Sequence, residues 1–383
     1  MSGAGLSRLL SRVERFTKQL GVEVPVLLAP MSGACPPSLS IAVANAGGMG
    51  ACGALLMEPK AIGAWVEEFR AESKGPFQIN LWIPEKRVRR DAEAEARQRA
   101  FLGQWGPAIL EKDSADRSDS QVSEARPGAP VPDEGGLPDF RAQCAALLEL
   151  KPTAVSSIMG VFPAEFVAEM KARGILWLAT ATTAEEARSA EAAGADAVIA
   201  QGMEAGGHRG AFNEGDAEAQ MVGLFALVPQ ICDAVRVPVI AAGGIGDGRG
   251  VAAALMLGAS AVVVGTGFLR APEAKLHAAY AERIGQTEAH QTQVTRAYSG
   301  RAARGIGNAY MEASARAVID GVARPAAYPV QRGLTKGMRE EAVKAGDTEK
   351  MQMWVGQAAR LALAEPAGVI TRRLWDEARE LLG

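Results

Sequence analysis

The stretch ADAVIAQGMEAGGHRGAF, residues 195–212, joins an apolar run to a glycine-rich loop that carries one of the chain's three histidines. The run, residues 195–202, is apolar almost throughout, which is typical of a strand buried on both faces of a parallel sheet. Glycines flank His208 closely, and because they lack a side chain they let the backbone fold tightly around the imidazole. The stretch therefore predicts a buried strand whose C-terminal loop presents a histidine.

Seven further runs resemble residues 195–202, and helical patterns separate most of them. In TAEEARSAEAAGA, residues 183–195, Thr183 is suited to begin a helix and Gly194 to end it. Buried strands that alternate with helices indicate a parallel sheet, and eight such units close into a (β/α)8 TIM barrel. The seven runs are VPVLLAP (24–30), MGACGA (49–54), PFQINLW (76–82), AVSSIMG (154–160), GILWLATA (174–181), VPVIAAGG (237–244) and ASAVVVGT (259–266).

An open doubly wound sheet is the alternative architecture. It would want a Gly-x-Gly-x-x-Gly turn after an early strand. The nearest candidate, GGIGDGRG at residues 243–250, follows the seventh strand in chain order and has Arg249 where the third glycine belongs. The sequence therefore favours the barrel among α/β folds.

Three other segments accompany the barrel, which we place at residues 21–275. Residues 1–20 have apolar side chains at helical spacing with charged residues between them, so we expect an amphipathic N-terminal helix. Residues 111–138 are polar, proline-rich and without periodicity, which predicts an exposed insertion between the third and fourth strands. Residues 276–383 are mainly helical by pattern, and we expect them to form a subdomain that covers the active site as a lid.

The composition favours a small ligand. The 383 residues carry a net charge of -3 without a long basic stretch, so neither nucleic acid nor a membrane surface is an expected partner. No apolar run approaches the roughly 20 residues of a membrane span. The four cysteines are scattered, with no C-x-x-C pair and no histidine at ligand spacing. We expect reduced thiols, a cytoplasmic monomer or homodimer, and no metal.

Glycines concentrate at the ends of the predicted strands, where the reactive face of a (β/α)8 barrel lies. Gly243 and Gly244 follow the seventh strand, while Gly265 and Thr266 follow the eighth. Backbone N–H groups at these two strand ends form the usual phosphate site of such barrels. The alternative is that both pairs are only tight turns.

Polar side chains at other strand ends face the same mouth of the predicted barrel. The amides of Asn80 and Gln201 are suited to hydrogen bond the edge of a heterocycle or its ribityl chain, which together with a phosphate suggests FMN. His208 could take a proton from carbon or nitrogen, or hold an anion, near neutral pH. His277 and His290 lie in polar helical segments, and we expect them to be structural.

Six motifs in this order resemble the class I nitronate monooxygenases. The resemblance runs from about residue 21 to the C-terminus, apart from the 111–138 insertion. The motifs are PVLLAPMSG with VANAGGMG (25–33, 43–50), QINLW (78–82), AQGMEAGGHRGAF (200–212), VPVIAAGGIGDGRG (237–250), GASAVVVGTGFL (258–269) and SGRAARGIGN (299–308).

The resemblance implies an FMN-dependent barrel that oxidises alkyl nitronates, typically propionate 3-nitronate, with O2 to a carbonyl product and nitrite. No metal is needed. His208 would be the active-site base and the partner of the anion. The residues that would line the flavin are Met31, Ser32, Asn80, Gln201, Gly206, Gly243, Gly244, Gly265 and Thr266.

The sequence departs from the family pattern at two places. The family often has a histidine in the fourth strand, where this chain offers Ser157. Of the residues that the family places around the substrate, Tyr328 and Lys336 match, but Arg332 stands where a second tyrosine is expected. Arg332 and Lys336 would favour an anionic substrate such as a nitronate with a carboxylate, the alternative being ordinary surface charge.

Two other functions remain open from the sequence alone. Related FMN barrels include NAD(P)H:quinone reductases and enoyl reductases, which share the phosphate loops; reduction of the flavin by NAD(P)H would indicate one of these. A barrel without flavin that only binds a phosphorylated metabolite is the second alternative, and protein that stays colourless after FMN is added would indicate it.

Overall fold

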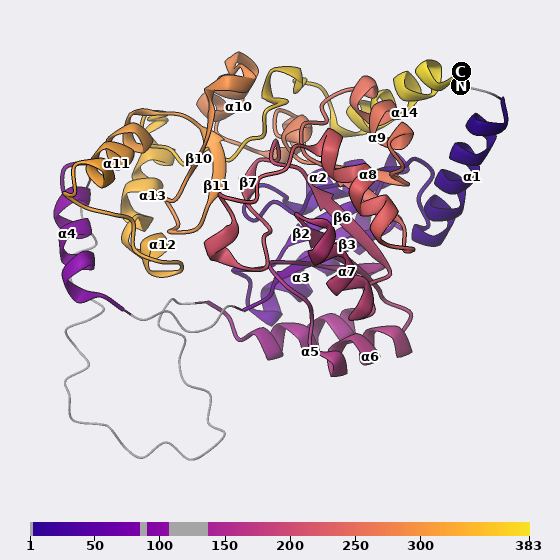
Figure 1. Cartoon of the computed structure of the whole chain (residues 1–383), viewed down its shortest axis with the longest axis horizontal. Coiled ribbons are helices and arrows are strands. Elements are labelled where there is room, and N and C mark those ends of the chain that lie inside the picture. The colour runs from indigo at the N-terminus through magenta and orange to yellow at the C-terminus, as the bar shows by residue number, and fades with distance from the viewer. Residues whose placement is uncertain (1–2, 85–89, 107–136) are drawn as a thin grey trace.

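The computed structural model describes residues 3–84, 90–106 and 137–383, and its centre is an eight-stranded parallel sheet (Figure 1). The strand order is β1-β9-β8-β6-β5-β4-β3-β2, and a parallel bridge between Leu27 and Met49 joins the two ends of this order. The predicted (β/α)8 barrel is therefore confirmed, and every strand falls within a predicted run. The strands are β1 (Val26–Leu28), β2 (Gly50–Gly53), β3 (Phe77–Trp82), β4 (Ala154–Ile158), β5 (Leu176–Ala181), β6 (Ala197–Gln201), β8 (Val239–Ala242) and β9 (Ala261–Val264).

Helices cover the outside of the barrel, as the alternating pattern requires. Thr183 begins one of them by accepting a hydrogen bond from the Glu186 N–H at 3.2 Å, and Gly194 follows its end with a φ of 101°. Both outcomes match the expected cap and stop. The outer helices are α2 (Pro37–Asn45), α3 (Pro59–Glu72), α5 (Phe140–Leu150), α6 (Ala164–Ala172), α7 (Ala184–Ala192), α8 (Leu224–Ala234), α9 (Gly248–Met256) and α14 (Ala367–Leu382).

The last helix, α14, completes this outer layer although it lies about 100 residues after β9. It contacts both α9 and α2, and its buried side chains Ile370 and Leu374 belong to the main hydrophobic core. The final part of the range 276–383 is thus attached to the barrel wall. The intervening chain forms α10 (Ala278–Gln286), β10 (Thr292–Thr295), β11 (Ala303–Ile306), α11 (Ala309–Ile319), α12 (Val330–Leu334) and α13 (Lys336–Ala345). A lid function for it stays a prediction.

A small antiparallel sheet connects this C-terminal segment to the loop after β6. Strand β7 (Gly207–His208) pairs with β11, which in turn pairs with β10. The sequence predicts a loop around His208 and helices at its partner, so neither of these short strands is foreseen. The pairing places His208 opposite Ala303.

The interior of the barrel is apolar, and the N-terminal helix closes one end of it. Helix α1 (Gly3–Leu20) is amphipathic and puts Phe16 and Leu20 at the end where the strands begin. The members of this inner cluster include Phe16, Leu20, Val22, Leu27, Met49, Leu178, Ile199, Ile240 and Val263.

Two further predictions concern the insertion between the third and fourth strands and membrane-spanning segments. Residues 111–136 of the predicted insertion lie outside the described residues. In the described part of the chain, no helix combines the length and the apolar character that a membrane crossing needs.

The contact between α9 and α14 provides a test of the packing of the outer helices. A Cβ added at Gly248 would come within 2.7 Å of the Ala378 backbone nitrogen and would also overlap the Glu377 side chain. We expect Gly248→Ala to lower the free energy of unfolding by about 1–3 kcal/mol in urea denaturation, since overpacking forces the helices apart. Gly250→Ala is the control, because its nearest neighbour would be at 3.4 Å. Equal stability of the two variants would contradict this packing.

Candidate active site

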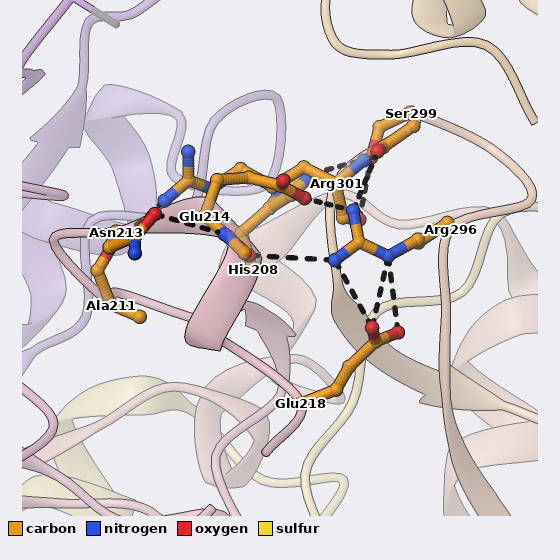
Figure 2. Close-up of polar contacts among 10 residues, drawn as sticks. His208, Ala211, Asn213, Glu214, Glu218, Arg296, Ser299 and Arg301 are labelled. Atoms are coloured by element: carbon orange, nitrogen blue, oxygen red, sulfur yellow. Dashed lines mark hydrogen bonds and ion pairs between the residues drawn. The ribbon is translucent and has the colours of Figure 1, made fainter. Parts of the chain in front are cut away.

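His208 lies at the centre of a group of side chains that come from four separate parts of the chain. Its Nε2 is 2.8 Å from the Ser299 hydroxyl, in the turn between β10 and β11 (Figure 2). Trp82, the last residue of β3, lies edge-on to the imidazole with 4.8 Å between ring centroids, and Trp354 lies at 5.5 Å. Tyr328 lies tilted against Trp82, with 5.5 Å between ring centroids. The imidazole is therefore held between aromatic rings at the barrel mouth.

Burial and two neighbouring guanidinium groups keep His208 neutral. Burial of the imidazole lowers its pKa to about 3, and the positive charges of Arg332 and Arg339 act in the same direction. A neutral imidazole has one nitrogen that donates a hydrogen bond and one that accepts. His208 can therefore accept a proton at one nitrogen without first losing one.

The two arginines near His208 lack acidic partners in the described residues. Arg339 donates only to neutral groups, the Thr335 hydroxyl, the Gln352 side-chain amide oxygen and the Arg332 carbonyl, at 2.9–3.1 Å. Burial and the Arg332 charge lower the pKa of Arg339 to about 10, so it stays charged at neutral pH. Among the described residues neither guanidinium lies within 4 Å of a carboxylate, although the charge of Glu340 acts on Arg339 from further away. Positive charge without an ion-paired carboxylate, beside a neutral base, favours an anionic ligand.

The glycines after β8 and β9 form a row of backbone donors at the same end of the barrel. Gly243 and Gly244 have φ angles of 114° and 69°, which only glycine adopts readily. The N–H groups of these two residues, and those of Gly265 and Thr266, donate to no group in the chain as far as it is described. Such clustered free N–H groups suit an anion like phosphate. These four predicted residues are thus brought together at the ends of adjacent strands.

Of the two predicted amide side chains, Asn80 keeps an atom available to a ligand and Gln201 uses both ends of its amide within the protein. Asn80 donates to the Ser156 carbonyl and hydroxyl at 3.2 and 3.1 Å, which leaves its own amide oxygen without a donor among the described residues. Gln201 uses both ends of its amide on the histidine loop: Nε2 donates to the His208 carbonyl at 3.1 Å and Oε1 accepts from the Gly210 N–H at 2.7 Å. Gln201 therefore shapes the loop that holds His208.

The chain is similar to known proteins over nearly its whole length. A family model described as nitronate monooxygenase matches residues 13–377. The chain is 39% identical over 371 residues to a nitronate monooxygenase of Pseudomonas aeruginosa, with 96% of this chain and 99% of the relative covered. It is 32% identical to a probable nitronate monooxygenase of Staphylococcus aureus strain Newman, over 96% and 98% of the two chains.

The chain belongs to the nitronate monooxygenase family.

A solved structure supports the same assignment. The structure of nitroalkane oxidase from Streptomyces ansochromogenes superposes with a TM-score of 0.79 at 33% identity, covering 94% of this chain and 96% of that one. Membership confirms the resemblance found in the sequence and the expectation of a flavin-dependent oxidoreductase.

Other predicted flavin residues lie against neighbouring loops. Met31 lies close to Gly265, since a Cβ added there would be 3.3 Å from the methionine sulfur, and Ser32 contacts Gly53 at the end of β2. Gly206 packs against the backbone of residues 355–356, and the Thr266 hydroxyl accepts from the Gly356 N–H at 2.9 Å. The segment around Gly356 thus crosses the loops that follow β6 and β9.

The predicted substrate residues are only partly brought together. Tyr328 and Arg332 lie near Trp82 and His208, as described above. Lys336 is exposed at the start of α13, 3.8 Å from Glu340, and makes no contact with the histidine in the described structure. Ser157, which replaces the family histidine, accepts from the Trp177 indole at 2.9 Å between β4 and β5 and does not contact His208.

Three buried arginines explain why the motifs at 200–212 and 299–308 occur together. Each donates to a backbone carbonyl in the loop after β6. The charged side chain thereby supplies a hydrogen bond that the irregular backbone does not make with itself. The bonds run from Arg209 to Gly202 (2.7 Å), from Arg301 to Ala211 (2.8 Å) and from Arg304 to Met203 (2.9 Å). Figure 2 shows Arg301 reaching across to Ala211.

Sequence reasoning gave no role to four residues around His208. Trp82 ends a predicted strand, so asking which side chains face the strand ends could have found it. Ser299 begins one of the six motifs but lies in a turn between two strands that were not predicted. Trp354 and Arg339 lie in a long segment with a helical pattern and carry no local signal. Only the tertiary fold brings them to the site.

The neutral state of His208 gives a pH-dependent prediction. In an unfolded chain a histidine has a pKa of about 6.5, so between this value and about 3 the unfolded state binds a proton that the folded state does not. We expect the free energy of unfolding to fall as the pH falls through this window, and His208→Asn to lose that part of the dependence.

An NMR titration of the histidine rings measures the same property directly. The His208 signals should not shift between about pH 5 and pH 8. A midpoint near 6.5 would contradict the neutral assignment.

Proposed function

We propose that the protein is an FMN-dependent nitronate monooxygenase that oxidises alkyl nitronates, propionate 3-nitronate or a similar compound, with O2 to a carbonyl product and nitrite. The observation that carries the proposal is a neutral, partly buried His208 beside two guanidinium groups without ion-paired carboxylates in the described chain. An anionic substrate would supply the missing negative charge. Family membership supports the same reaction.

The donor set at the barrel mouth fits FMN. The free N–H groups of Gly243, Gly244, Gly265 and Thr266 would hold its phosphate, and a side chain at either positive-φ glycine would be strained. The Asn80 amide oxygen could accept from the polar edge of the ring system. Met31, Ser32, Gln201 and Gly206 would complete the surrounding loops. FMN, when bound, supplies the electron acceptor for the nitronate and the route to O2.

The chain's own residues would bind and orient the substrate. Arg332 and Arg339 draw the anion to the mouth by charge, and the neutral His208 offers a lone pair to a proton of the substrate. Trp82 and Trp354 surround the imidazole and exclude water from it. Tyr328 and Lys336 remain predicted substrate residues.

Two finer points belong to the same proposal. All four cysteines are free thiols, which suits a reducing compartment, and we propose a cytoplasmic location. We also propose that the protein is a monomer or a homodimer.

Substitution of the histidine tests the proposal. We expect His208→Asn to retain bound flavin, since the imidazole makes no part of the glycine cradle, while nitrite formation from propionate 3-nitronate falls by about 10²–10⁴-fold. The matched control is His290→Asn, at an exposed position away from the site, which should keep full activity. Undiminished turnover of His208→Asn would remove this residue from the mechanism.

A further inference from the structure

The hydroxyl of Ser299 contacts one of the two ring nitrogens of His208. It lies 2.8 Å from Nε2, while no described residue hydrogen bonds to Nδ1. The two residues are 91 positions apart in the chain, and the pairing of β7 with β11 brings them together. Because a neutral imidazole has one protonated nitrogen, the direction of this hydrogen bond decides the chemistry of Nδ1.

The surroundings of Ser299 fix the direction of that bond. Its hydroxyl can donate to the Arg301 carbonyl at 3.2 Å and accept from the Arg301 N–H at 3.3 Å. If it does both, its remaining lone pair can accept from a proton on His208 Nε2. All three close contacts of the hydroxyl are then hydrogen bonds with a donor and an acceptor.

The opposite arrangement leaves more groups unsatisfied. If Ser299 donated to Nε2, the hydroxyl proton would no longer reach the Arg301 carbonyl, and one of the three hydrogen bonds would be lost. The proton of the imidazole would then lie on Nδ1, where no acceptor is found among the described residues. Even at a partly buried position a donor without an acceptor is costly, so the first arrangement is favoured.

The turn that carries Ser299 is held on both sides. On one side, Arg296 donates to the Gly300 carbonyl at 3.2 Å and pairs with Glu214 and Glu218 in the loop after His208 (Figure 2). On the other side, the Thr335 hydroxyl donates to the Tyr298 carbonyl at 2.6 Å. The serine hydroxyl is therefore presented to His208 at a fixed position and is not a mobile surface group.

We propose that Ser299 is a positioning residue that holds His208 in the tautomer protonated at Nε2, so that Nδ1 carries the free lone pair. The inference rests on the proposed function for the role of that lone pair. It adds which nitrogen accepts a proton and which side chain determines it. Trp82 and Trp354 fix the ring plane, and Ser299 fixes the proton.

The tautomer can be measured without any turnover. The chain has only three histidines, so protein labelled with ¹⁵N-histidine gives three pairs of ring nitrogens, and His208→Asn assigns the pair that disappears. In the wild type, we expect Nε2 of His208 to have the shift of a protonated nitrogen and Nδ1 that of an unprotonated one. A spectrum with the proton on Nδ1 would overturn the proposal.

Ser299→Ala tests whether the serine is the cause. We expect the variant to lose the single tautomer and show a mixture, with kcat for the nitronate lowered roughly tenfold and KM little changed. Ser314→Ala, a buried serine on α11, should leave both unchanged. If Ser299→Ala keeps the wild-type tautomer, Ser299 does not determine it and the proposal fails.

A second variant covers a failure to fold, and one further result separates this inference from the proposed function. Should Ser299→Ala not fold, Ser299→Cys keeps a side chain of similar shape with a much weaker hydrogen bond and is expected to show the same mixture of tautomers. If the wild type has the expected tautomer but does not oxidise nitronates, the proposed function fails while the assignment of the proton stands.

Discussion

The pairing of β7 with β11 is the interaction on which the site depends. Two residues, Gly207 and His208, join the loop after the sixth barrel strand to a segment nearly 100 residues further along the chain. Without this pairing Ser299 would not meet the histidine, and the carbonyls of the loop would lose the arginines that bind them. A barrel alone would present a flexible glycine loop at this position. The pairing of β7 with β11 and the buried arginines hold this loop in one conformation.

The charges of the site are unbalanced in a way that matches its proposed use. Arg332 and Arg339 lower the pKa of His208, and in the described chain neither forms an ion pair with a carboxylate, although the charge of Glu340 acts on Arg339 from further away. Such an arrangement costs stability in the free protein, and an anionic ligand would relieve it. Binding of the nitronate and the basicity of His208 are thus coupled, because an anion that neutralises the guanidinium groups also makes a proton on the imidazole less unfavourable.

Periodicity predicted the barrel, since each strand is a local apolar run and each outer helix a local pattern. The glycines after β8 and β9 were found because each directly follows a predicted strand, and Gly243 and Gly244 have the positive φ angles that favour glycine locally. The role of α14 as the last outer helix, the strands β7 and β11, and the contacts of Ser299 and Trp354 were not predictable. Each depends on which distant segments meet, and a two-residue strand carries no periodic signal at all.

The most direct test of the account is an anaerobic spectrum of the purified flavoprotein, mixed separately with propionate 3-nitronate and with NADH or NADPH. The account predicts that bound FMN is bleached by the nitronate and stays oxidised with the nicotinamides. Bleaching by NAD(P)H and not by the nitronate would contradict it. The barrel and its phosphate cradle would then serve a reductase, and the positive charge around His208 would need another substrate.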